Sequence, residues 1–151
     1  MQAEQRILRI EFSVHAHATE DVGRVKQALL NLLPEQVRGK VVFSEAVVEG
    51  HYSNPIRRIT VNVSGNDAVK VLEYLGSKLD DVEKRALAVS LDLRYDEKEG
   101  RLYMRFSKQD AFLGRVKLYD GDDVVRVVIV FRGSPSLEDV RRVLEEVGLL
   151  P

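Results

Sequence analysis

Apolar and polar residues alternate in several stretches of the chain, and this two-residue period predicts β-strands. The alternation runs through residues 7–14 and 56–64, and residues 40–49 are expected to form a further strand between them. Residues 124–131 are almost continuously apolar, which is typical of a central strand that is covered on both faces.

Helices are predicted where apolar residues recur every three or four positions. Residues 22–33 follow this spacing, with Thr19 as the expected N-cap and Pro34 as the end of the helix. A second helix is expected to have Asn66 as its N-cap and to reach residue 79.

The second half of the chain is less regular. Residues 80–95 fit both periods, and we favour a short helix that passes into a strand near Leu91. The turn at residues 96–100 then joins this strand to residues 101–106 as a hairpin. A last helix is expected to follow residues 134–136.

Strands and helices follow one another without regular βαβ alternation, and no repeat or linker divides the 151 residues. The sequence therefore predicts one domain, residues 1–151, of the α+β class. We expect a single mostly antiparallel or mixed sheet, with helices packed mainly on one face.

Composition limits the classes of function. With 23 Lys and Arg against 24 Asp and Glu, any nucleic-acid partner must be bound by a local patch. The absence of cysteine removes disulfides, thiolate zinc sites and cysteine nucleophiles. No targeting segment or membrane-spanning run is visible, so we expect a cytoplasmic protein. The charged fraction of 31% is typical of heat-adapted proteins.

The most basic stretch covers residues 101–117. On a strand, Arg101, Tyr103 and Arg105 share one face, so two guanidinium groups would flank a ring that can stack on a base. The alternative is a solvated charged strand. The cationic residues of the whole stretch are Arg101, Arg105, Lys108, Arg115 and Lys117.

Within this stretch, residues 107–114 have the pattern of a single helical turn, with Ser107 as its N-cap and Gly114 as its end. The free backbone N–H groups of this turn, beside Lys108 and Gln109, would form a small anion site. An ordinary connecting segment is the alternative.

A second candidate for contact with phosphate is the turn at residues 50–55 together with the two arginines that follow it. This segment contains no acid, and guanidinium groups bind phosphate oxygens in pairs. The alternative is a loop that Asn54 and Pro55 hold in shape. The candidate residues are His51, Tyr52, Asn54, Arg57 and Arg58.

His15 and His17 lie at the end of the first expected strand, and with His51 and nearby carboxylates they could form a metal site. Their spacing matches no known metal motif, so we predict no metal. The alternatives are hydrogen bonds to the backbone, or contact with RNA for His17 and His51. No nucleophile elbow, P-loop or dinucleotide fingerprint is present, so we predict neither a catalytic residue nor a cofactor.

Three motifs together resemble an archaeal family of RNA-binding proteins and predicted exosome subunits. They are VHAHATED at residues 14–21, GHYSNPI at 50–56 and LYMRFSKQDAFLG at 102–114. That family usually has one histidine before its Ala-Thr-Glu-Asp, which His17 matches, so His15 is extra here. The resemblance implies RNA as partner and a fold like that of the ribosomal protein that binds 5S rRNA.

We therefore predict a non-enzymatic RNA-binding protein, acting alone or as an accessory to exosome-related RNA processing or to ribosome-related machinery. One alternative is a protein-interaction module, such as a homodimer, that meets its partner through a sheet edge or a helix face. The other is a metal-dependent hydrolase that uses the histidine turns.

Overall fold

The computed structural model describes residues 2–49 and 54–151. Within these ranges six strands form one antiparallel sheet in the order β2-β3-β1-β6-β5-β4. The strands are β1 (Ile7–Ala16), β2 (Ser44–Glu49), β3 (Pro55–Ser64), β4 (Tyr95–Asp96), β5 (Arg101–Ser107) and β6 (Val124–Phe131).

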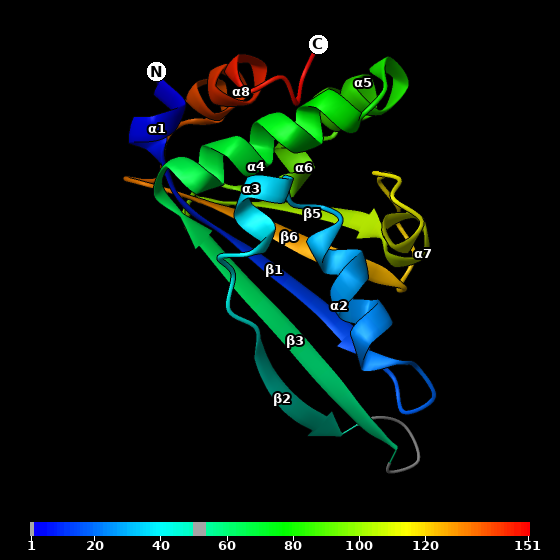
Figure 1. The fold of residues 1–151 in the computed structure, drawn as a ribbon. Helices are drawn as coiled ribbons and strands as arrows, with labels where there is room; N and C mark the ends of the chain where they lie inside the picture. The colour runs from blue at the N-terminus through cyan, green and yellow to red at the C-terminus, as the bar shows by residue number, and fades with distance from the viewer. Residues whose placement is uncertain (1, 50–53) are drawn as a thin grey trace.

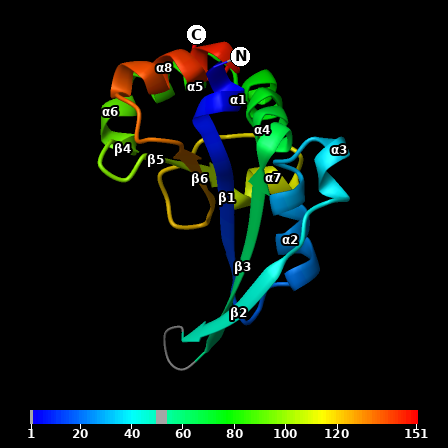
Figure 2. The same cartoon turned by 90° about the vertical axis from the view of Figure 1, so that its left-hand side faces the viewer.

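Most of the helices pack against one face of this sheet. Figure 1 shows α2, α3 and α4 in front of the strands, and in Figure 2 they lie with α7 on one side of β1 and β3. This arrangement confirms the predicted α+β class. The helices are α1 (Gln2–Arg6), α2 (Val22–Leu30), α3 (Glu35–Arg38), α4 (Gly65–Lys78), α5 (Asp81–Val89), α6 (Leu91–Arg94), α7 (Lys108–Phe112) and α8 (Leu137–Glu146).

The core lies between the sheet and these helices. Along β1, Ile10, Phe12 and Val14 are fully buried, and Phe12 lies between Val61 of β3 and Val127 of β6. Because side chains alternate along a strand, the residues between them point to the opposite face. We call that second face the open face; it carries Arg9, Glu11, Ser13 and His15 of β1, Arg58, Thr60 and Asn62 of β3, Arg126 and Val128 of β6, and Arg101, Tyr103 and Arg105 of β5.

Two predicted helix starts were wrong. The first helix is capped by Asp21 and not by Thr19, because the Asp21 carboxylate accepts hydrogen bonds from the N–H groups of Gly23 and Arg24. The second begins directly after β3 at Gly65, whose φ of +65° lets the chain turn from strand into helix.

The predicted strand near Leu91 was also wrong, because Leu91–Arg94 form the short helix α6 and the strand begins only at Tyr95. Leu87 and Leu91 are both fully buried at a spacing of four, which fits a helix. The hairpin between β4 and β5 and the last helix, capped by Ser136, form as expected. In the described part of the chain, every helix is too short or too polar to cross a membrane.

Candidate nucleic-acid interface

The register of the sheet brings arginines from three strands onto the open face, with Arg105 and Arg126 directly opposite each other and Arg58 two residues further along its strand. Arg126 of β6 lies opposite Arg105 of β5 on one side and Ser13 of β1 on the other, while Arg58 of β3 lies opposite His15. Neighbouring strands are about 4.8 Å apart, so the row from β3 to β5 is about 15 Å long. We call Arg58, Arg126 and Arg105 the arginine row.

The arginine row also acts on His15. Burial lowers the pKa of His15 below its usual value, and the nearby charges of Arg126 and Arg58 lower it further. His15 is therefore neutral at pH 7, and the positive charge of this region comes from the guanidinium groups.

Two more arginines on the open face share one acid. Arg9 Nε lies 2.8 Å from one carboxylate oxygen of Glu11, and Arg101 Nη1 lies 2.9 Å from the other. Burial alone would raise the pKa of Glu11, but the hydrogen bonds from Arg9 and Arg101 outweigh it and lower the pKa. Glu11 stays ionised, and the trio keeps one positive charge.

Aromatic rings lie among these cations. Tyr103 is 45% exposed and stands between Arg101 and Arg105 along β5. Tyr119 is 50% exposed, and its N–H donates to the carbonyl of Arg105. The bridge between Phe106 and Leu118 puts both of those side chains on the core side, so Tyr119 lies on the same side of the sheet as Arg105.

The loop after Tyr119 fixes the side chain of Arg105. Arg105 Nη2 donates a hydrogen bond to the carbonyl of Gly121 and lies 3.8 Å from Asp122. The ring of Tyr119 packs so closely on Gly121 that a Cβ at this position would collide with it. Arg105 is thus preorganised, whereas Arg58 and Arg126 are exposed and form no ion pair with any described residue.

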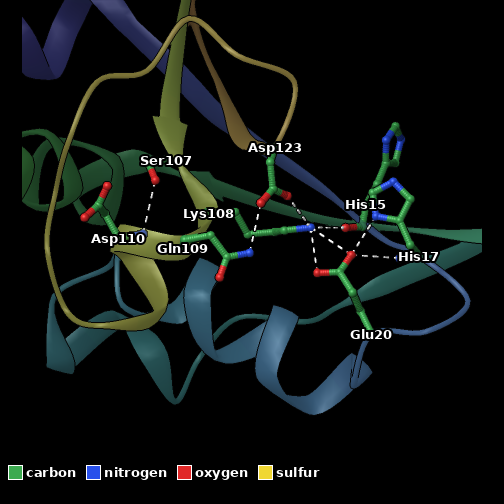
Figure 3. Close-up of polar contacts among 8 residues, drawn as sticks. All are labelled: His15, His17, Glu20, Ser107, Lys108, Gln109, Asp110 and Asp123. Carbon is green, nitrogen blue, oxygen red and sulfur yellow. Dashed lines mark hydrogen bonds and ion pairs between the residues drawn. The ribbon is translucent and has the colours of Figure 1, made fainter.

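Lys108 behaves differently from the other cations of its segment. Its side chain is only 5% exposed, and its Nζ lies 2.9 Å from Glu20 and 2.7 Å from Asp123 (Figure 3). It also donates to the carbonyl of His15 at 3.1 Å. The predicted helical turn forms with Ser107 as its cap, but its lysine is already neutralised by two carboxylates.

His17 and Gln109 complete this group, which we call the Lys108 cluster (His17, Glu20, Lys108, Gln109 and Asp123). His17 Nδ1 lies 2.6 Å from Glu20, and the Gln109 amide donates to Asp123 at 2.9 Å (Figure 3). The cluster joins two of the three sequence motifs, VHAHATED and LYMRFSKQDAFLG, at the end of β1.

The electrostatics of the cluster keep both acids ionised. Burial would raise the pKa of Glu20, but hydrogen bonds from the His17 N–H and from Lys108 lower it below its usual value. Burial would also raise the pKa of Asp123, but the hydrogen bonds from Lys108 and Gln109 lower it below its usual value.

The two arginines after the second turn point to opposite faces. Arg58 belongs to the open face, whereas Arg57 lies opposite Ala16 on the other face and pairs with Glu45 at 3.2 Å. Asn54 is exposed at the start of β3. The predicted contacts His51 and Tyr52 lie outside the described residues.

The remaining cations of the basic stretch are exposed. Arg115 lies 3.8 Å from Asp110, and its side chain is 64% exposed. The carbonyl of Lys117 accepts a hydrogen bond from the Ser107 N–H, so Lys117 lies beside β5 near the arginine row.

Sequence reasoning missed Arg126 and Tyr119. Arg126 is the one charged residue in the apolar run of β6. Because side chains alternate along a strand, a charged residue in such a run is expected on the face that the helices do not cover, and this signal could have identified Arg126. Tyr119 could not be placed, because its segment has no periodic pattern and is held by pairing with β5.

A pocket of about 580 Å³ lies between the open face and the Lys108 cluster. Ser13, His15 and Arg126 of the open face form one part of its wall, and Glu20, Lys108 and Asp123 form another. Among residues 2–49 and 54–151, no group of three or more His, Asp or Glu side chains is placed to hold a metal ion.

Comparison with known proteins adds to this geometry. The model of a family described as RNA-binding matches residues 9–131. The chain belongs to this family. The chain is also similar to an RNA-binding protein of Pyrococcus abyssi, 35% identical over 132 residues, with 86% of this chain and 85% of that protein covered.

An uncharacterised protein of Methanocaldococcus jannaschii is 34% identical over 124 residues, covering 82% of this chain and 83% of that protein. The crystal structure of a protein from Archaeoglobus fulgidus, of the family of unknown function DUF54, has a TM-score of 0.78 at 26% identity. It covers 93% of this chain and 99% of its own. The resemblance to an archaeal RNA-binding family is thereby confirmed.

Proposed function

We propose that this protein binds RNA on the open face of its sheet. The observation that carries the proposal is the arginine row, because folding brings cations from three strands together in a chain whose net charge is −1. The description of the family as RNA-binding supports the same function.

The chemistry of the open face suits a flexible strand of RNA. Arg58 and Arg126 offer guanidinium forks that match phosphate oxygens. Tyr103 and Tyr119 offer rings on which bases stack whatever their identity. Because phosphate contacts supply much of the affinity, binding should weaken steeply as salt rises.

Titration of a labelled single-stranded RNA and of a structured RNA at two salt concentrations tests the proposal. For the single strand, the double variant Arg58→Ala/Arg126→Ala should lower the slope of log affinity against log salt by about 0.7 for each phosphate that the protein no longer binds. Arg142→Ala on α8, which removes an exposed arginine far from the open face, is the matched control. Absence of binding at low salt, or equal slopes for both variants, would contradict the proposal.

The other predicted contacts belong to the same proposal with different roles. Arg101 and Lys117 would meet phosphates at the margin of the arginine row, and Arg115 is a further candidate for phosphate contact. His51, Tyr52 and Asn54 would contribute stacking or hydrogen bonds to the RNA. His17, Lys108 and Gln109 would hold the end of the face in shape. Association with exosome or ribosomal components in the cytoplasm also stays part of the proposal, and crosslinking in cells followed by sequencing of the recovered RNA would test it.

A second candidate function is self-association through helices α5 and α6. Val82, Val89 and Leu93 are 66%, 84% and 86% exposed, which is unusual for large apolar side chains. Pairing of this surface with the same surface of a second copy would bury the apolar side chains of both. Sedimentation of the wild type and of Val89→Glu over a range of concentrations tests it, and a monomer throughout would rule it out.

A further inference from the structure

The pocket beside the Lys108 cluster is a site that RNA binding along the arginine row does not explain. Its volume of about 580 Å³ lies within the range of small-molecule sites, roughly 300–1,000 Å³. It opens from the arginine row, because His15 and Arg126 belong both to the open face and to the pocket wall.

The charges inside the pocket differ from those of the open face. Its wall carries three carboxylates, Glu20, Asp122 and Asp123, but only two cations, Lys108 and Arg126. Lys108 lies between Glu20 and Asp123 and neutralises only one of them. Asp122 is fully exposed and lies 3.8 Å from Arg105.

These groups select for a ligand that donates hydrogen bonds. A carboxylate has about four lone-pair positions, so Asp123, which accepts from Lys108 and Gln109, can take further bonds, and so can the exposed carboxylate of Asp122. Glu20 already accepts from Lys108 and twice from His17. A phosphate deep in the pocket would lie beside the carboxylates of Asp122 and Asp123, whereas hydroxyl groups would meet them as hydrogen-bond acceptors. Carboxylates recognise ribose hydroxyls in this way in dinucleotide-binding folds.

We propose that the pocket holds the 3′-terminal nucleoside of an RNA strand that lies on the open face. The vicinal 2′- and 3′-hydroxyls donate to the carboxylates of Asp122 and Asp123, and the last phosphate of the strand meets Arg126 at the rim. A 3′ end is the part of a strand that combines two neighbouring hydroxyls with no further phosphate. This inference rests on the proposed function and adds a preference for strand ends.

Binding of one oligoribonucleotide with different 3′ ends tests the inference. The strand carries an internal fluorescent label and ends in a free diol, a 3′-phosphate or a 2′,3′-dideoxynucleotide. We expect the diol to bind about tenfold more tightly than the 3′-phosphate, because the phosphate would meet like charges. Equal affinity of all three, with salt-dependent binding intact, overturns the inference and leaves the proposed function standing. No binding of any strand at low salt overturns both.

A variant pair in the loop before β6 assigns the effect to the pocket. Asp122→Asn removes one carboxylate from the wall, and because Asp122 is fully exposed the fold should survive. The variant should bind the 3′-phosphate strand several-fold more tightly than the wild type does. The ratio between the affinities for the diol strand and for the 3′-phosphate strand should therefore fall. Asp120→Asn, an exposed neighbour outside the pocket wall, is the control and should keep the full difference. An unchanged difference in Asp122→Asn overturns the inference.

Titration with free nucleotides gives a readout that does not depend on strand affinity. Adenosine 5′-monophosphate keeps the diol, whereas adenosine 3′-monophosphate does not. We expect the ring resonances of His15 and His17 to shift with the first nucleotide and to stay in place with the second. Equal shifts with both, or none with either, count against the pocket as a nucleoside site.

Discussion

The arginine row and the Lys108 cluster use the same kind of residue for opposite purposes. Arg105 and Lys108 are only three positions apart, yet Arg105 lies on the open face beside the exposed Arg126, and Lys108 is buried between two acids. The difference comes from the end of β5, where the strand passes into α7 and turns the lysine away from the open face. Charge counted along a sequence therefore does not tell which cations are free to meet a ligand.

The largest effect is expected from removal of the buried cation. Lys108→Met leaves Glu20 and Asp123 without their common partner, and we expect the free energy of unfolding to fall by about 2–4 kcal/mol. Lys117→Met changes an exposed lysine of the same basic segment and should leave the free energy of unfolding nearly unchanged. Urea denaturation of the two variants gives the comparison, and equal stabilities would mean that the cluster is not structural.

Acid should weaken the Lys108 cluster before it affects the arginine row. The folded-state pKa values of Glu20 and Asp123 lie below their ordinary values of 4.5 and 3.8. Their contribution to stability is therefore complete above about pH 5 and is lost as the pH falls through the lowered values. Denaturation curves at pH 6 and pH 3 should differ less in Glu20→Gln than in the wild type. An identical pH dependence of both proteins would argue against this role.

Substitutions on the open face should change the affinity for RNA and leave the stability of the fold unchanged. Tyr103→Ala removes a stacking surface between two arginines, and we expect RNA affinity to fall about tenfold. Tyr103→Phe keeps the ring and should bind as the wild type does. Anisotropy titrations give the affinities and thermal melting checks the fold. Equal weakening in both variants would shift the role from the ring to the hydroxyl.

Arg57 should give the smallest effect. It lies on the face opposite the arginine row and forms an exposed pair with Glu45, and such surface pairs contribute little to stability. Arg57→Ala should change RNA affinity by less than about twofold, while Arg58→Ala should reduce it clearly. A larger effect of Arg57→Ala would place the RNA on the other side of the sheet.

Much of the fold could be predicted because its elements carry strong local patterns. The strands with clear alternation and the helix capped by Ser136 form where the periodicity places them. Residues 91–94 were misassigned because Leu91 and Leu93 fit both periods, and the burial of Leu91 beside Leu87 decided for a helix. Such a choice depends on tertiary contacts that the local pattern does not contain.

The candidate site was predictable only in part. The alternation along β5 placed Arg101, Tyr103 and Arg105 on one face, and the structure shows this arrangement. The sequence could not show that Arg126 lies opposite Arg105, because strand order is set by packing between distant segments. It also could not show that Lys108 meets Glu20 and Asp123, which come from two other parts of the chain.

The contact between Lys108 and Glu20 joins residues that are 88 positions apart. Closing so long a loop costs conformational entropy, which the two ion pairs of Lys108 help to offset. The same side chain also donates to the carbonyl of His15, so it fastens the start of α7 to the end of β1. The buried lysine thus works as a cross-link between two distant segments of the chain.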